Sequence, residues 1–378
     1  MPDLPFHILS AAKLKELQAA AKSAEEKLSE TSQLLQAQQG ISDAALHSMS
    51  EGVLAVDREG HIILANPAIE KMFNITEPEV VGKTVREGTR NNEIADIMET
   101  SLRDGRPISQ EIDIVVPFQA SLIVRTSLIS DEEKNVLGAI CVLHDITDIK
   151  KLENYRSEFV ANVSHELKTP LTVIRNYVET LLNGAIEDKK HNIEFLEKIN
   201  KHAASLSDLI SDILELSQLE TKKDLGAFAE VDLRNIMLKA IETIQPKAEK
   251  KKISISTNCG QSEHKVVGIE EHIYRAILNL LDNAVNYTGE SGKIEISCRQ
   301  EKGALSIIIA DTGIGIPKEH QPRIFERFFR VDKARSRDLG GTGLGLAIVK
   351  HVMNLHNGSV TLESEEGKGA RFTLVFPI

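Results

Sequence analysis

The sequence lacks two features that would narrow its function. No apolar run approaches the roughly 20 residues that a membrane-spanning helix needs, and no secretory signal peptide is visible. Positive charge is not in excess either, because 45 lysines and arginines stand against 56 aspartates and glutamates, which gives a net charge of −11. We therefore expect no direct binding of nucleic acid.

Cysteine is also scarce. The three cysteines, Cys141, Cys259 and Cys298, have neither metal-site nor disulfide spacing and lie in apolar, strand-like runs. We predict that they are core residues of a protein in a reducing compartment. The length of 378 residues is enough for two or three domains.

The most informative segment that is present runs over residues 159–170. Its apolar positions continue into the next turns and predict one helical stripe roughly 120° wide, at about 100° per residue: Phe159, Val163, Leu167, Leu171, Ile174, Val178 and Leu181. His165 lies about 180° from the centre of this stripe, so we expect it to face solvent. Glu166 and Thr169 flank it.

An exposed imidazole beside a carboxylate has the properties of a reactive nucleophile. The carboxylate can hold the ring in one tautomer and accept its proton. The alternative is that His165 is an ordinary surface residue of an amphipathic helix.

A second group of polar residues begins in a predicted helix, residues 279–287. Asn279 and Asn283 are four residues apart and share a face of that helix. Amide oxygens are hard, neutral ligands that suit a Mg²⁺ ion also bound to phosphate oxygens. This pattern suits a magnesium site at the two asparagines.

Two glycine clusters follow. A buried strand predicted over residues 305–310 ends at Asp311, with Gly313 and Gly315 after it, which suits an adenine amino group close to the backbone. The run Gly340–Gly345 precedes a helix predicted over residues 346–352, and free amides at a helix start suit phosphate. Either cluster alone is a weak signal, because tight turns also need glycine.

Together with Phe325-x-x-Phe328-x-Arg330 between the glycine clusters, these segments resemble the sensor histidine kinases of two-component signalling, in that family's order. The resemblance is close over residues 150–378. Asp145-Ile-Thr147 leading to His165 is most similar to PhoR, the phosphate-responsive branch.

The predicted fold is multidomain α+β, in four parts. Residues 1–40 form an N-terminal helix, either a parallel coiled coil with a weak heptad seam or a solvent-exposed leader. Residues 41–146 are predicted to contain two strands, a helical middle and three strands, an order that resembles a PAS sensor domain, for which we expect no tightly bound cofactor. Residues 147–225 form a helical hairpin for dimerisation and phosphotransfer. Its two helices are separated at Asn183-Gly184, and the second has an inward stripe at three- and four-residue spacing from Leu196 to Glu220 that includes Ile210. Two copies make a four-helix bundle that buries these stripes. Residues 228–378 form an α/β sandwich that binds ATP.

The resemblance implies a function. It implies that Mg²⁺ binds at Asn283, with Asn279 assisting. His165 is the phosphoacceptor from MgATP, Glu166 activates it, and the phosphoryl group passes to an aspartate of a response regulator with a DNA-binding output domain, PhoB/PhoP-like. Thr169 would position water in a phosphatase reaction, or merely precede Pro170. The expected ATP-contacting residues are these: Asn279, Asn283, Tyr287, Asp311, Gly313, Gly315, Phe325, Arg330, Gly341, Thr342, Gly343, Leu344 and Gly345. Residues 325–339 would form a mobile lid.

Two other functions share parts of this pattern. A gyrase- or chaperone-type ATPase places a glutamate where Asn279 stands, and asparagine cannot act as that base. A catalytically silent scaffold would not need the intact motifs. The departures Asn286, where relatives often have a basic residue, and Ser205, where they often have arginine, would tune the balance of kinase and phosphatase activity. The location expected is the cytoplasm, as a soluble kinase or as the cytoplasmic portion of a membrane-anchored parent.

Overall fold

The computed structural model describes residues 11–115, 119–188, 190–221, 226–260, 264–301, 303–332 and 341–378. The chain divides into two compact units, residues 1–156 and 157–378, and each is described by itself. Within the described residues, no helix has both the length and the apolar character to cross a membrane.

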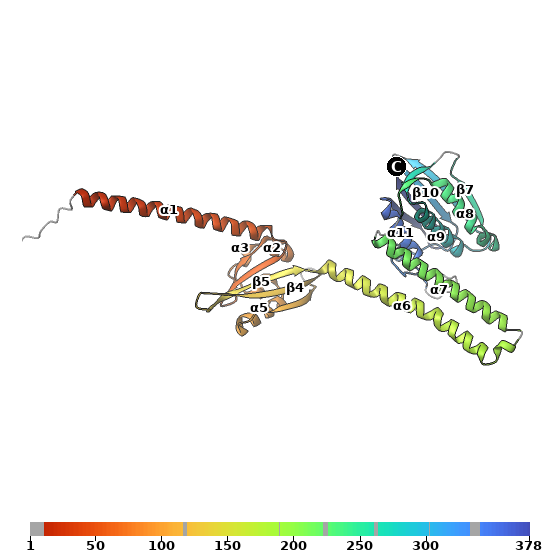
Figure 1. The fold of residues 1–378 in the computed structure, drawn as a ribbon, viewed down its shortest axis with the longest axis horizontal. Helices are drawn as coiled ribbons and strands as arrows, with labels where there is room; N and C mark the ends of the chain where they lie inside the picture. The colour runs from red at the N-terminus through yellow and green to blue at the C-terminus, as the bar shows by residue number, and fades with distance from the viewer. Residues whose placement is uncertain are drawn as a thin grey trace, which may run out of the picture. The chain divides into compact units, whose positions relative to one another are not determined.

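The first unit begins with the long helix α1 (Ala11–Ser48), which is followed by a sheet and short helices (Figure 1). The sheet is antiparallel and has the order β2-β1-β5-β4-β3. Its strands are β1 (Gly52–Asp57), β2 (Ile62–Ala65), β3 (Ser109–Ile114), β4 (Ala120–Ser130) and β5 (Val136–Asp145). Between β2 and β3 lie α2 (Pro67–Phe73), α3 (Glu77–Val80), α4 (Val85–Thr89) and α5 (Asn92–Asp104). Two strands, a helical middle and three strands are the predicted order.

The core of this unit lies between the sheet and the short helices. Leu54, Ile69, Ile94 and Leu122 are fully buried there. Cys141 on β5 belongs to the same core, and burial raises the pKa of its thiol to about 12. The core position predicted for this cysteine is confirmed.

The second unit takes in most of a helical hairpin, made of α6 (Thr147–Leu182), the short 3₁₀ helix η1 (Ala185–Glu187) and α7 (Asn192–Thr221). The first helix ends at Asn183-Gly184, as predicted, and Gly184 has the φ of +112° that glycine tolerates best. Several apolar side chains of the hairpin are exposed in the single chain, including Leu171, Leu182, Leu196, Ile210 and Leu214.

The rest of the second unit is a two-layer α/β structure. Its main sheet has the order β11-β12-β10-β9-β7, with β7 parallel to β9 and the other neighbours antiparallel, and β6 pairs with β8 in a small second sheet. The strands are β6 (Ala229–Asp232), β7 (Ser254–Asn258), β8 (Lys265–Gly268), β9 (Lys293–Glu301), β10 (Ala304–Asp311), β11 (Ser359–Ser364) and β12 (Ala370–Pro377). The helices are α8 (Leu233–Lys250), α9 (Glu270–Tyr287), the 3₁₀ turn η2 (Gln321–Arg323) and α11 (Gly345–Leu355).

Helix α9 is central to this layer arrangement. Its residues Ile273, Ile277, Leu281 and Val285 recur every four positions and are completely buried in the core shared with the sheet. The same periodicity leaves Asn279 and Asn283 on a half-buried face. The α/β sandwich predicted for this part of the chain is confirmed.

For the other two cysteines the core position is confirmed, because Cys259 is buried in the core of the second unit and Cys298 packs against it. The prediction that they form no disulfide was wrong. Cys259, just after β7, and Cys298 on β9 form a disulfide across the two parallel strands. Their separation of 39 residues is not a recognisable disulfide spacing, because the strand pairing that brings them together is a tertiary contact.

Candidate active site

The predicted phosphoacceptor lies on the exposed side of α6. The His165 side chain is 66% exposed, and its Nδ1 lies 3.8 Å from Glu166 Oε1. The prediction that His165 faces solvent is therefore confirmed. Glu166 is the carboxylate on the Nδ1 side of the ring, and at 3.8 Å it lies beyond hydrogen-bond distance, so it would have to move closer to orient the imidazole.

Thr169 lies one turn further along α6. Its hydroxyl donates to the His165 carbonyl oxygen at 3.1 Å, a bond that threonine often makes within a helix. Pro170 lies inside α6, which continues to Leu182. The Thr169 side chain is thus placed by its own helix, on the same stretch as His165.

The asparagines of α9 lie close to the start of α11. Asn279 Nδ2 donates to the Gly345 carbonyl oxygen at 3.4 Å, which joins two of the predicted nucleotide-binding segments. Asn283 is half-buried one turn later, and Tyr287, the last residue of α9, is exposed. Lys251 stabilises this end of the helix by donating to the carbonyl oxygens of Val285 and Asn286 at 2.7 and 2.9 Å.

Asp311 ends β10 in a half-buried position. Its Oδ1 accepts from the amides of Gly313 at 2.8 Å and Ala370 at 3.3 Å. Burial raises the pKa of this carboxyl, although the two amide hydrogen bonds act in the opposite direction. Such a carboxylate is costly to keep, which is typical of a residue that binds a ligand.

The glycines after Asp311 are required by close contacts. A Cβ on Gly313 would lie 2.7 Å from the Tyr287 carbonyl oxygen, and one on Gly315, at φ +67°, would lie 2.0 Å from the Glu365 carbonyl oxygen. Gly313 therefore allows the turn after β10 to lie against the end of α9.

The second glycine cluster pairs with the segment 325–330. The Phe328 amide donates to the Gly343 carbonyl oxygen at 2.9 Å, and Gly343 has φ +75°. A Cβ on Gly343 would lie 3.2 Å from Arg330 Nε. Leu344 is fully buried in the core, so it anchors the loop where α11 begins.

The segment 325–330 also contacts α6. Arg330 Nη2 donates to Glu166 Oε2 at 3.4 Å, and the Arg330 side chain is 9% exposed. The rings of Phe159 and Phe328 lie 5.9 Å apart, and Phe325 packs edge-on against Phe372 in the core. The structure thus connects two predicted site residues, Glu166 and Arg330, that are 164 positions apart in the sequence. The predicted lid also includes residues 333–339, which lie outside the described residues.

Sequence reasoning missed four functional candidates, which are Asp212, Glu215 and Glu220 on α7 and Arg275 on α9. Asp212 on α7 accepts from Thr342 Oγ1 at 2.8 Å and from Arg275 Nη2 at 2.7 Å, and Arg275 Nε donates to Glu215 Oε2 at 3.1 Å. Burial raises the pKa of Asp212, against the effect of these hydrogen bonds. Glu220, near the end of α7, pairs with Arg327.

A sequence signal for this contact existed. Leu209, Asp212, Leu216 and Leu219 recur at three- and four-residue spacing and are all buried against the α/β layer. This is a second stripe on α7, next to the one predicted from Leu196 to Glu220. The single aspartate in an otherwise apolar stripe disguised it.

The two residues that depart from the family pattern, Asn286 and Ser205, each form a hydrogen bond within their own helix. Asn286 is buried, and its amide donates to Asp282 Oδ2 at 2.8 Å within α9. Ser205 donates to the Lys201 carbonyl oxygen of its own helix at 3.1 Å.

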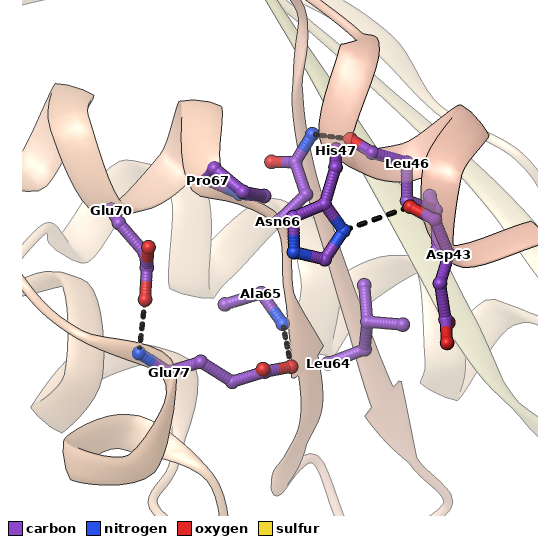
Figure 2. Close-up of a pocket in the computed structure, with 9 residues that line it drawn as sticks. All are labelled: Asp43, Leu46, His47, Leu64, Ala65, Asn66, Pro67, Glu70 and Glu77. Atoms are coloured by element: carbon purple, nitrogen blue, oxygen red, sulfur yellow. Dashed lines mark hydrogen bonds between the residues drawn. The ribbon is translucent and has the colours of Figure 1, made fainter. Parts of the chain in front are cut away.

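A small cavity of about 130 Å³ lies in the first unit, between the end of α1 and the segment β2–α3 (Figure 2). Two of its three carboxylates bind backbone amides: Glu70 accepts from the Glu77 amide at 2.7 Å, and Glu77 accepts from the Ala65 amide at 3.3 Å. Among the described residues, no group of three or more His, Cys, Asp and Glu side chains is arranged to hold a metal ion. The cavity is thus a packing feature at the junction of α1 and the sheet.

Three parts of the chain match known protein families. Residues 268–378 match the family "Histidine kinase-, DNA gyrase B-, and HSP90-like ATPase", and residues 155–222 match the "His Kinase A (phospho-acceptor) domain". Residues 42–146 match the "PAS fold". The Sensor-like histidine kinase SenX3 of Mycolicibacterium smegmatis is 36% identical over 329 residues, which cover 86% of this chain and 83% of SenX3.

The chain belongs to the sensor histidine kinases. It is an ATP-dependent protein-histidine kinase of two-component signalling, and its kinship with SenX3 is compatible with the predicted likeness to PhoR. The Sensor histidine kinase WalK of Bacillus subtilis is 34% identical over 334 residues, 87% of this chain but 54% of WalK, so the chain spans about half the length of that relative.

Among solved structures, the histidine kinase ThkA in complex with response regulator protein TrrA has a TM-score of 0.48 and 21% identity, over 88% of this chain and 97% of that one. This similarity is too low to inform the site. The phospho-acceptor family match is the finding that separates this kinase from the ATPases that share its nucleotide-binding fold.

Proposed function

We propose that the chain transfers the γ-phosphoryl group of MgATP to His165 and then to an aspartate of a response regulator. The observation that carries this proposal is the exposed His165, with Glu166 at 3.8 Å, in the same unit as the nucleotide-binding fold. Arg330 contacts Glu166 and also lies beside Gly343, so it would connect the phosphoacceptor helix with the loop that binds the ATP phosphates.

The nucleotide would bind across α9 and the two glycine clusters. Two amides donate to Asp311 Oδ1, so Oδ2 would accept from the adenine amino group. Tyr287 would pack on the nucleotide, with Gly313 and Gly315 allowing close approach. The amides of residues 341–345, at the start of α11, would receive the phosphates.

The residues present fit a magnesium ion. Asn283 Oδ1 would be its protein ligand, and Asn279, whose Nδ2 is used by Gly345, would present its own Oδ1 beside it. Mg²⁺ commonly takes one or two protein oxygens together with phosphate oxygens, so no cage of carboxylates is needed. Bound there, the ion would neutralise charge on the transferring phosphoryl group.

In the transfer step, Glu166 holds the imidazole through Nδ1, and the Nε2 lone pair attacks the γ-phosphorus in line. A nitrogen–phosphorus bond forms, the bond to the bridging oxygen breaks, and ADP leaves. The phosphoryl group then passes from Nε2 to an aspartate oxygen of the response regulator, one with a DNA-binding output domain.

Thr169 would support the reverse task of dephosphorylating the regulator. Its hydroxyl is one turn from His165 and can hold a water molecule for attack on the aspartyl phosphate. The variant Thr169→Ala should then keep autophosphorylation and lose regulator dephosphorylation. Equal dephosphorylation by variant and wild type would remove Thr169 from this role.

The experiment is labelling of the full chain with [γ-³²P]ATP and Mg²⁺. We expect acid-labile, base-stable label in the wild type and none in His165→Gln. The matched control is His191→Gln, because His191 is on the same hairpin, is also exposed and has a carboxylate partner, Asp188, at 2.8 Å. Label that persists in His165→Gln would contradict the assignment, and equal phosphate release by all three proteins would favour an ATPase.

A further inference from the structure

The contact between α7 and the second glycine cluster is made by Thr342, one of the residues expected to contact ATP. Thr342 Oγ1 donates to Asp212 Oδ2 at 2.8 Å and accepts from the Leu344 amide at 3.2 Å. The Thr342 hydroxyl therefore donates its proton to a carboxylate of α7. The Leu344 amide, one of the amides proposed to bind phosphate, donates to that hydroxyl instead.

Asp212 is held firmly in this position. Arg275 on α9 donates to its other oxygen at 2.7 Å, and Glu215, one turn on along α7, receives the Nε of the same arginine at 3.1 Å. His272 Nδ1 lies 3.9 Å from Glu215 Oε1, at the edge of the cluster. The Asp212 side chain is 9% exposed, so the contact is shielded from solvent.

Docking of α7 on the α/β layer does not by itself require a carboxylate at position 212. Leu209, Leu216 and Leu219 on the same stripe dock α7 with buried apolar side chains. An aspartate among them must be desolvated, and replacing buried ion pairs by apolar residues is often neutral or stabilising. A buried carboxylate next to the proposed phosphate-binding loop can instead be a bond that a phosphate oxygen of the nucleotide replaces.

We propose that Asp212 is a built-in competitor of the nucleotide: its carboxylate takes the place of a phosphate oxygen on Thr342, so docking of α7 and binding of ATP phosphates exclude each other at this loop. The proposal rests on the proposed role of residues 341–345 as the phosphate cradle. By linkage, ATP weakens the docking of α7 by the same factor by which docking weakens ATP binding.

This competition has a consequence for the kinase. The helix whose docking is weakened belongs to the hairpin that carries His165, so nucleotide binding would release the α/β layer from α7 for its approach to the phosphoacceptor. Asp212 is a positioning residue in this scheme, since it acts through Thr342 and touches neither substrate.

The test is the dissociation constant of a fluorescent ATP analogue with Mg²⁺, measured on the full chain. Asp212→Asn should bind at least about threefold more tightly than wild type, and should lower the KM for ATP more than it changes kcat. Asp208→Asn is the matched control, because it removes the same charge from an exposed position one turn earlier on α7. It should leave the dissociation constant unchanged.

A mutant cycle with Thr342→Val separates competition from general electrostatics. Asp212→Asn should have less than half its effect, on a logarithmic scale, when the Thr342 hydroxyl is absent. Glu215→Gln, which loosens Arg275 without touching Thr342, should also tighten ATP binding and serves if Asp212→Asn misfolds.

Unchanged or weaker ATP binding by both Asp212→Asn and Glu215→Gln would overturn the proposal. An equal effect of Asp212→Asn with and without the Thr342 hydroxyl would overturn it too. Failure of the wild type to bind the analogue would instead contradict the proposed nucleotide site, so the two failures are distinguishable.

Discussion

At the scale of single residues, the carboxylate of Asp311 is a stability cost. It is half-buried at the end of β10, and burial raises its pKa above the ordinary value of 3.8. The native state therefore binds this proton more tightly than the unfolded chain does, so its contribution to stability falls as pH rises above about 3.8 and stays unfavourable above the native pKa. A ligand that accepts the charged form would recover this cost.

The variant Asp311→Asn tests this account. Asparagine keeps an oxygen for the amides of Gly313 and Ala370 but has no charge, so the nucleotide-free variant should melt at a higher temperature than wild type at pH 7. The difference should shrink towards pH 4, and ATP affinity should fall by about tenfold or more as a charge-assisted hydrogen bond is lost. Differential scanning fluorimetry against pH measures the first effect.

The alanine variant is the control for this prediction. Asp311→Ala leaves the two amides without their acceptor and should melt below wild type. A lower melting temperature for Asp311→Asn at pH 7 would show that the charge is favourable in the native state, contrary to this account.

At the scale of elements, the disulfide Cys259–Cys298 ties β7, the edge strand of the main sheet, to β9. Both sulfurs lie near Met237 Sδ on α8, at 3.5 and 4.0 Å. The bond closes a loop that includes β8 and α9, which carries Asn279 and Asn283. Oxidation or reduction of this disulfide should therefore affect the stability of the α/β structure that carries the proposed nucleotide site.

Reduction of this bond should lower the free energy of unfolding. A loop of this length corresponds to about 3–4 kcal/mol in the chain-entropy description, which urea unfolding with and without dithiothreitol can measure. The double variant Cys259→Ser/Cys298→Ser should be insensitive to reductant. Cys141→Ser is the control, because that thiol is free and buried in the other unit, so it should keep the sensitivity. Identical unfolding of wild type in both conditions would contradict the prediction.

At the scale of the whole molecule, the hairpin does not bury its apolar side chains within one chain. Leu171 on α6 is 59% exposed and Ile210 on α7 is 46% exposed, although both belong to predicted inward stripes. Large exposed apolar surfaces of this kind mark interaction sites. A homodimeric four-helix bundle would cover them, and we propose this assembly.

The double variant Leu171→Glu/Ile210→Glu should be monomeric. Placing charges in the bundle core costs several kcal/mol, so the dimer dissociation constant should rise by about 100-fold or more, which sedimentation velocity measures. Val267→Glu on β8 is the control, since Val267 is 67% exposed and lies outside the hairpin. A double variant that remains dimeric at the wild-type affinity would place the dimer contact elsewhere.

Local patterns were enough for much of this protein. The spacing of apolar residues predicted the hairpin, the order of strands in the first unit and the solvent-facing position of His165, because helix and strand periodicities are local properties of the chain. The order of the asparagine and glycine clusters carried the family resemblance that implied the nucleotide-binding fold, because each cluster is a short local segment of the sequence.

Only the tertiary structure decided which distant residues meet. The pairing of Cys259 with Cys298, the bond from Arg330 to Glu166 and the clamp of Arg275 and Thr342 on Asp212 each join segments separated by 39 to 164 positions. No periodicity encodes such contacts, because they depend on how whole layers pack. The sequence by itself therefore determined the elements and the chemistry of the motifs, and the packing of α7 on the α/β layer determined how those motifs are coupled.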